Sequence, residues 1–218
     1  MKIGILFDLD GTLLDTLEDL HSATNYILRK YGLPERSLEE IRRFVGNGAR
    51  VQISKALPGW ADDPPLEQVL EDYQQYYNAT CKDGTAAPYP GVMEALAQLQ
   101  TRYPVAVVSN KPDPAVRELS KSYFGDVYAR GVSEDCPRKP APDMVYKAME
   151  ALGVEKCVYV GDSEVDVATA RNAGVPCLTV LWGFRDEAML KEAGATHFCS
   201  KAEDMPGMIE QLIRETFH

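Results

Sequence analysis

The sequence predicts an α/β protein: a parallel β-sheet core covered by helices, with a separate all-helical segment inserted after the first strand. Most of the expected strands are continuous apolar runs, which is typical of parallel strands that have helices on both faces. From about residue 88 onward these runs alternate with helical patterns. Residues 16–81, in contrast, carry helical patterns only. The resulting fold class is a Rossmann-like core with an inserted helical cap.

The first strand covers residues 3–7 and leads into the helical segment. Apolar residues recur at helical spacing from Leu17 to Tyr31, and Gly32 followed by Pro34 ends that helix. The pattern Ser37-Leu38-Glu39-Glu40 is a capping box, which opens a second helix. Two further helices are expected over residues 50–57 and 66–79.

The rest of the chain alternates between strands and helices. Strands are expected over residues 105–108, 127–128, 157–160, 175–181 and 195–199. Helices are expected over residues 92–99, 114–122, 143–152, 166–173, 185–193 and 205–217. We therefore divide the chain into a core of residues 1–15 and 83–218 and a cap of residues 16–82, with hinges near Asp15-Thr16 and Lys82 to Ala87.

Composition and charge narrow the possible functions. The 218 residues are 45% hydrophobic and 26% charged, as in an ordinary globular protein. The net charge is -10, and no Lys/Arg-rich run exists, so nucleic acid and anionic membranes are not expected partners. Five cysteines without a CxxC pair fit a reducing cytoplasm. Asp8 interrupts the first apolar run, which argues against a signal peptide, and no run is long enough to cross a bilayer. We expect a cytoplasmic protein; the sequence does not predict its oligomeric state.

Polar residues follow three of the expected strands, where ligands bind in open parallel sheets. Any one of these groups could equally be a structural turn or cap. Carboxylates beside a buried strand are costly, however, unless they are paired or bound to a metal. The residues concerned are Asp8 and Asp10, then Ser109 and Asn110, then Asp162, which Asp166 follows closely. Lys139, in the expected loop of residues 134–142, adds a positive charge. Together they indicate a functional site at this edge of the sheet.

The residue types favour phosphoryl transfer. A compact set of carboxylates suits Mg²⁺, which also takes phosphate oxygens and waters as ligands. One aspartate can attack phosphorus to form an aspartyl-phosphate, and a second can protonate the leaving oxygen and then activate water. Lys139 would offset the charge of a phosphate that approaches carboxylates. The hydroxyl of Ser109 would hold the other phosphoryl oxygens.

Four motifs, in this order and spacing, resemble those of the haloacid dehalogenase-like hydrolases. They are FDLDGT at 7–12, VVSNK at 107–111, RKPAPD at 138–143 and VGDSEVD at 160–166. The resemblance covers essentially the whole chain and implies the fold predicted above.

The resemblance also implies a role for each motif residue. Asp8 would be the nucleophile and Asp10 the general acid and base. Ser109 would bind phosphate, and Lys139 would steady the nucleophile and the transferring group. Asp162 would bind Mg²⁺ together with Asp8 and the backbone carbonyl of Asp10, and Asp166 would support this metal site. Asp166 could also be the N-cap of the following helix, and the two roles are compatible.

Within the family, the chain is most similar to the phosphoglycolate phosphatases, in FVGNGAR at 44–50, VVSNKP at 107–112 and VLWGF at 180–184. The expected activity is therefore Mg²⁺-dependent hydrolysis of a small phosphomonoester. Pyrophosphate, nucleotides and sugar phosphates stay open as substrates. The Gly46-Asn47-Gly48 turn is expected to reach over the site, and Arg50 to meet a substrate carboxylate. Asn110 and Lys111 are also expected near the substrate. For Arg50 and Lys111, however, the sequence is equally compatible with an exposed position on the surface.

Other activities are weighed at single positions. The dehalogenases of the family lack the second motif-one aspartate, so Asp10 favours phosphoryl transfer. The β-phosphoglucomutase-like members carry a histidine where this chain has Leu20, and His21 follows one position late. Receiver domains of signalling proteins have a similar acidic site, but they are much shorter and lack a helical insert.

Overall fold

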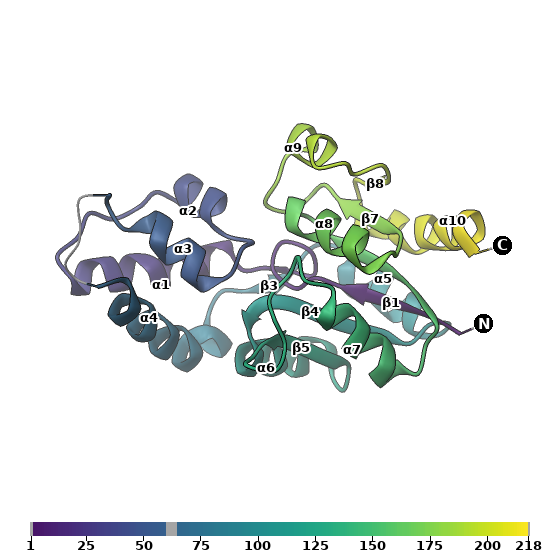
Figure 1. Ribbon diagram of the computed structural model, residues 1–218, viewed down its shortest axis with the longest axis horizontal. Helices are drawn as coiled ribbons and strands as arrows, with labels where there is room; N and C mark the ends of the chain where they lie inside the picture. Colours follow the sequence, from purple (N-terminus) through teal and green to yellow (C-terminus); the bar gives the residue numbers. More distant parts are fainter. Residues whose placement is uncertain (1, 60–64, 218) are drawn as a thin grey trace.

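The computed structural model describes residues 2–59 and 65–217 and has a six-stranded parallel sheet at its centre (Figure 1). The strands lie in the order β5-β4-β1-β6-β7-β8, and each neighbouring pair is parallel. Their bounds are β1 Ile3–Phe7, β4 Val105–Pro112, β5 Tyr128–Val132, β6 Lys156–Gly161, β7 Cys177–Val180 and β8 Phe198–Cys199. The predicted α/β fold is confirmed.

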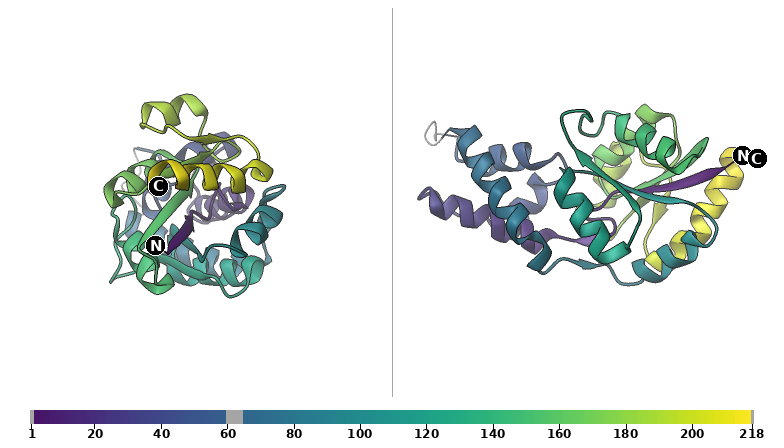
Figure 2. Two further views of the ribbon diagram at one scale, coloured as in Figure 1. Left: turned by 90° about the vertical axis from the view of Figure 1, so that its right-hand side faces the viewer. Right: turned by 90° about the horizontal axis from the view of Figure 1, so that it is seen from below.

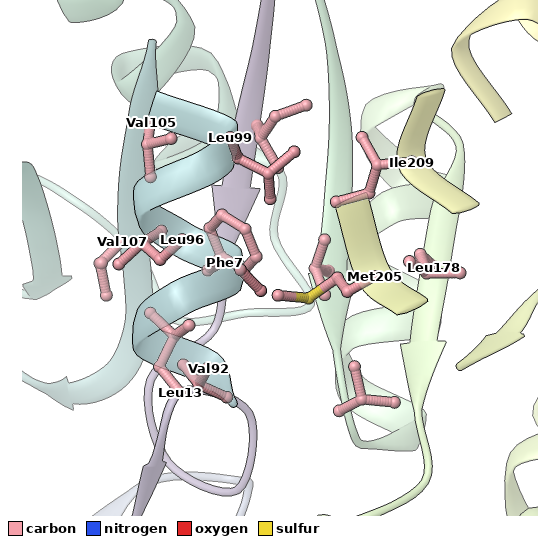
Figure 3. Packing of buried hydrophobic residues seen from close by; sticks show 14 of the residues in the cluster. Phe7, Leu13, Val92, Leu96, Leu99, Val105, Val107, Leu178, Met205 and Ile209 are labelled. Carbon is pink, nitrogen blue, oxygen red and sulfur yellow. The ribbon is translucent and has the colours of Figure 1, made fainter. Parts of the chain in front are cut away.

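Helices cover both faces of the sheet because successive side chains of each strand point to opposite sides. On one face, Phe7 of β1 packs in a cluster with side chains of α5 and α10 (Figure 3). Side chains of α6 belong to the same cluster. On the other face, the neighbouring Leu6 packs with side chains of α7 and α8. The helices are α5 Val92–Gln100, α6 Asp113–Phe124, α7 Asp143–Leu152, α8 Glu164–Ala173, α9 Glu187–Glu192 and α10 Met205–Phe217. Full burial of a large apolar side chain contributes about 1.5–3 kcal/mol, so both faces stabilise β1 and fix its end.

Residues 17–59 and 65–80 form a cluster of helices at one end of the molecule, and the start of β1 and the end of α10 lie at the opposite end (Figure 2). The helices are α1 Leu17–Lys30, α2 Leu38–Phe44, α3 Ala49–Ala56 and α4 Leu66–Thr80, and they share a hydrophobic cluster of their own. The capping box expected at Ser37 is present, since Ser37 and Glu40 each bond the other's backbone N–H. The division into a core of residues 1–15 and 83–218 and a cap of residues 16–82 remains our proposal. Residues 1 and 218 of the core and 60–64 of the cap lie outside the described residues.

The two connections between these helices and the core are paired with each other. Leu14–Asp15 (β2) and Ala87–Pro88 (β3) form an antiparallel pair. The carboxylate of Asp19 on α1 accepts hydrogen bonds from Thr85 N at 2.6 Å, Thr85 Oγ1 at 2.8 Å and Ala86 N at 3.0 Å. The two segments expected as hinges therefore form one short antiparallel pair, and the second of them is hydrogen-bonded to the first cap helix.

Several elements differ from the sequence prediction at their ends. β4 continues four residues beyond Val108, because pairing with β5 holds its polar end although the apolar pattern stops. β5 is likewise longer than expected. α8 begins at Glu164, with Ser163 as N-cap and Asp166 as the third residue of a capping box, so Asp166 is not itself the N-cap. Among the helices of the described residues, none combines the length and apolar character needed to cross a membrane.

Replacing Asp19 with Ala should expose the second connection to protease. The substitution removes three hydrogen bonds to a charged acceptor, which lowers the free energy needed to open this segment locally. Trypsin should cleave after the exposed Lys82 roughly tenfold faster than in the wild type. Glu18→Ala, a change of an exposed acidic neighbour on the same helix, is the control. Equal cleavage rates in both variants would contradict this role for Asp19.

Candidate active site

The carboxyl ends of β1, β4 and β6 meet at a cavity between the sheet and the cap helices. Its empty volume, with the open space at its mouth included, is about 650 Å³. Core residues on the wall include Asp8, Ser109 and Asp162. Gly46 and Gly48 of the cap also line it, so the turn expected to reach over the site lies there.

Asp8 is the first residue after β1 and sits at the base of the cavity. Its backbone N–H donates to Val160 O at 2.9 Å, which continues the pairing of β1 with β6. Its Oδ1 accepts from Leu9 N at 2.7 Å and lies 2.8 Å from Lys139 Nζ. Leu9 is fully buried in the core. The backbone alternation therefore anchors Leu9 inside and holds the Asp8 carboxylate at the cavity.

Lys139 is 1% exposed, and all three ammonium protons have acceptors. Its Nζ lies 2.8 Å from Asp8 and from Asp166, and 3.0 Å from Tyr159 Oη. Burial lowers the pKa of Lys139, but Asp166 and Asp8 outweigh burial and raise that pKa above its usual value. The ammonium therefore stays charged and bridges two strand ends.

Asp166 is fully buried, and its carboxylate oxygens are both engaged. Oδ1 accepts from Lys139 and from Tyr159 Oη at 3.0 Å. Oδ2 accepts from the backbone N–H groups of Asp162 and Ser163 and from the Ser163 hydroxyl at 2.6 Å. Asp166 thus orients Lys139 and the start of α8.

Asp162 follows β6 and is almost fully buried. Its Oδ1 accepts from Thr12 Oγ1 at 3.1 Å, and its Oδ2 accepts from Phe184 N at 2.7 Å. A Cβ atom at Gly11 or at Gly183 would overlap this carboxylate, and Gly11 also has a φ of +83°. Both neighbours must be glycine for the backbone to approach Asp162 this closely.

Three buried carboxylates, Asp8, Asp162 and Asp166, each offer an oxygen within 4.8 Å of the others. Burial raises the pKa of Asp162 to about 7, and Asp166 adds to this increase. Burial likewise raises the pKa of Asp8 well above its usual range, with Asp166 acting in the same direction and Lys139 against it. One ammonium does not offset three carboxylates, so the hard oxygen set fits a divalent cation.

Asp10 faces a different partner. Its Oδ1 accepts from Thr16 Oγ1 at 2.6 Å and lies 2.9 Å from Lys111 Nζ. The ammonium of Lys111 is buried, donates to Tyr77 Oη at 2.7 Å and lies 4.5 Å from the centre of the Tyr77 ring. Lys111 is therefore a cavity residue and not a surface lysine.

Ser109 and Asn110 have separate roles. Ser109 is buried at the cavity, where its Oγ accepts from Lys111 N at 3.2 Å. The Asn110 amide accepts from Lys139 N at 2.7 Å and donates to Lys139 O and to Gly46 O, both at 3.1 Å. This side chain therefore positions Lys139 and contacts the cap. Asn110 also lines the cavity, and its expected contact with substrate stays a prediction.

For Arg50 the surface position, which the sequence left open, is the one observed. Its side chain is 51% exposed, pairs with Glu67 and does not line the cavity. Helix α3 turns Ala49 and Gln52 toward the cavity, and the helical repeat puts Arg50 on another side.

Sequence patterns missed several cavity residues. Tyr77 and Gln52 belong to cap helices, where their spacing looks like that of ordinary core or surface positions. Phe184 and Arg185 follow β7, and Arg185 was expected inside a helix that begins two residues later, at Glu187. For these two residues the sequence offered only the VLWGF segment at 180–184, and none of its side chains has a chemical group that predicts a role in the site.

Comparisons with known proteins show which proteins the chain is similar to. The sequence model of the haloacid dehalogenase-like hydrolase family matches residues 5–180. Phosphoglycolate phosphatases of Rhodobacter capsulatus and Cereibacter sphaeroides are 34% and 35% identical to the chain, with 96% of this chain and 98% and 99% of theirs aligned. A crystal structure from Lactobacillus delbrueckii subsp. bulgaricus, of a protein provisionally named a phosphoglycolate phosphatase, has a TM-score of 0.87 and 34% identity, covering 94% of this chain and 97% of that one.

Asp162→Asn should stabilise the metal-free protein at alkaline pH. The folded pKa of about 7 lies above the value of about 3.9 for an unfolded aspartate, so ionisation of Asp162 lowers stability as pH rises through this window. Thermal and urea unfolding in EDTA should show the advantage of the variant over the wild type growing by on the order of 2 kcal/mol from pH 5 to pH 8. Mg²⁺ should stabilise the wild type at pH 8 and the variant far less.

The matched control is Asp126→Asn, which neutralises an exposed aspartate outside the cavity. Its difference from the wild type should not change across the same pH range. A pH-independent difference for Asp162→Asn as well would contradict the electrostatic account of this site.

Proposed function

The chain belongs to the haloacid dehalogenase-like hydrolases, and we propose that it hydrolyses a small phosphomonoester that also carries a carboxylate, as phosphoglycolate does. It is a phosphatase, in keeping with relatives that align over nearly the whole chain. One observation carries the proposal for the site: the carboxylate of Asp8 is held at the cavity by Leu9 N and Lys139, with Asp10 on the same wall.

The reaction assigns attack to Asp8 and proton transfer to Asp10. Oδ1 of Asp8 is engaged by Leu9 N and Lys139, so Oδ2 is the oxygen that attacks phosphorus. The bond from phosphorus to the leaving oxygen breaks, and Asp10 gives that oxygen a proton. Asp10 then takes a proton from water as the water attacks the aspartyl-phosphate, which releases phosphate and restores Asp8.

Mg²⁺ is the cation that we assign to this site. Asp8 and Asp162 would hold it through carboxylate oxygens and Asp10 through its backbone carbonyl, and Asp166 supports them by ordering Ser163 and Lys139. When bound, Mg²⁺ supplies positive charge that offsets the phosphate beside these carboxylates. Ser109, buried at the end of β4, binds the phosphoryl oxygens in this proposal.

Lys111 is the group that we assign to the substrate carboxylate. Of the described residues that line the cavity, two carry a positive charge, Lys111 and Arg185. The guanidinium of Arg185 is engaged by Glu164 and by two cap carbonyls. The ammonium of Lys111 lies beside Asp10, close to where the leaving group must be protonated.

Hydrolysis is favoured over the mutase reaction by the position of His21. Its Nε2 lies 3.1 Å from Arg36 O and 3.0 Å from Asn25 Nδ2, and His21 does not line the cavity, whereas Leu20 does. We place the reaction in the cytoplasm, because all five cysteines are free, as in a reducing compartment.

Asp8→Asn should abolish turnover of p-nitrophenyl phosphate with Mg²⁺, by at least about 10³-fold, because the amide cannot act as the nucleophile. Asp126→Asn should keep wild-type activity, and circular dichroism should show both variants folded. Full activity in Asp8→Asn would refute the proposed reaction.

The mutase alternative has a separate test. Wild-type protein given β-glucose 1-phosphate should release inorganic phosphate and no glucose 6-phosphate.

Lys111→Gln should lower kcat/KM for phosphoglycolate more than for p-nitrophenyl phosphate, since only phosphoglycolate has a carboxylate. Loss of a buried charge partner costs at least about 2 kcal/mol, so the ratio of the two kcat/KM values should fall by roughly 30-fold. Arg50→Gln, at an exposed position, should leave this ratio unchanged. Equal losses on both substrates would rule out the specificity role of Lys111.

A further inference from the structure

We propose that Arg42 of the cap is a positioning residue for Asp162 and acts through the peptide group between Gly183 and Phe184. Closure of the cap and binding of a divalent cation at Asp162 then favour each other. The inference rests on the proposed role of Asp162 as a metal ligand.

The contact from Arg42 to Asp162 runs through one peptide group. Arg42 Nη2 donates to Gly183 O at 2.8 Å, and Arg42 Nε donates to the next carbonyl, Phe184 O, at 3.1 Å. Phe184 N, which shares its peptide group with Gly183 O, donates to Asp162 Oδ2 at 2.7 Å. Arg42 of the cap therefore bonds the carbonyl of this peptide group, and the Asp162 carboxylate bonds its N–H.

A peptide group transmits orientation because it is planar. If the Gly183 carbonyl is held toward Arg42, the N–H of Phe184 must point the other way, toward Asp162. A charged donor on the carbonyl also polarises the amide and strengthens the hydrogen bond on its other side. The two bonds of Arg42 go to successive carbonyls, a geometry that a lysine ammonium does not reproduce.

The surrounding packing leaves this peptide group little freedom in the observed arrangement of cap and core. Gly183 lies directly against Asp162, since a Cβ there would overlap the carboxylate. The buried Phe184 side chain belongs to the hydrophobic cluster of the cap, although Phe184 is a core residue. Arg185 donates to Arg42 O at 3.0 Å and to Val45 O at 2.7 Å, at the carboxyl end of α2. Three successive core residues thus contact the cap, and Arg42 contacts them in return.

Opening of the cap would remove these contacts together. The Gly183 carbonyl would lose Arg42, and Phe184 would lose the apolar side chains around it. The peptide group could then rotate, and Asp162 would lose one of its two donors, keeping Thr12 Oγ1. Because coupling between two equilibria is reciprocal, a cation that needs an ordered Asp162 must also favour the closed cap.

The chain offers a matched pair of arginines for the test. Arg43 is the next residue of α2, but its side chain is 70% exposed and pairs with Glu39 on the same helix. Mn²⁺ affinity is measured by electron paramagnetic resonance on the full chain without substrate, for wild type, Arg42→Ala, Arg42→Lys, Arg43→Ala and Asp162→Asn. Arg42→Ala and Arg42→Lys should weaken Mn²⁺ binding by about tenfold, as expected for a group that orients a ligand. Arg43→Ala should bind as the wild type does, and Asp162→Asn should lose the site.

Hydrogen exchange of residues 38–46 gives the reciprocal readout, which a loss of general stability would not reproduce. Mg²⁺ should slow exchange there in the wild type and in Arg43→Ala, and should have little effect in Arg42→Lys or Asp162→Asn. If Arg42→Ala unfolds at a much lower temperature, Arg42→Lys carries the comparison.

Wild-type Mn²⁺ affinity in both Arg42 variants would overturn the coupling and leave the proposed phosphatase site intact. Wild-type affinity in Asp162→Asn would instead overturn the metal site, and the coupling with it.

Discussion

The ammonium of Lys139, held between two buried carboxylates, is the interaction on which the rest of the site depends. It lies 2.8 Å from Asp8, which follows β1, and 2.8 Å from Asp166 at the start of α8. Removing it would leave both carboxylates buried without the positive charge that they share, at a cost of several kcal/mol. The Asn110 side chain, near the end of β4, bonds the backbone of Lys139. Lys139 therefore links the ends of three neighbouring strands, through its side chain and its backbone.

The buried carboxylates around Lys139 carry more negative charge than its single ammonium group offsets. Burial raises the pKa values of Asp8 and Asp162, because the carboxylates outnumber the ammonium and water is largely excluded. Gly11 and Gly183 bring the backbone so close to Asp162, and Gly161 so close to Asp166, that a Cβ atom at any of the three would overlap the aspartate side chain. Stability is thus given up at the one place where a cation and a phosphate would restore the balance of charge, as is common at active sites.

The cap is bound to the core in two physically different ways. The connecting segments form a ribbon that Asp19 holds to α1, so they limit the directions in which the cap can move. The seam over the cavity consists mainly of side chains that donate to backbone carbonyls, such as Arg138 to Asn47 O at 3.1 Å and Asn110 to Gly46 O. A hydrogen bond of this kind contributes only about 1 kcal/mol net, since water can replace either partner. The seam can therefore order the site when closed and still open for substrate.

The sequence by itself determined the succession of strands and helices and the parallel sheet, because apolar periodicity is a local signal. The ends of the expected strands indicated Asp8 and Asp162, whereas Lys139 was indicated only by the motif that resembles the family. The sequence placed helix and strand ends less well, since pairing and capping partners decide those. Only the tertiary structure decided that Lys111 lines the cavity and Arg50 does not, and that Asn110 serves Lys139. Those outcomes depend on how each cap helix is rotated and docked, and docking is set by contacts such as that of Arg42 with Gly183, 141 positions apart in the chain. No local pattern encodes a contact of that kind.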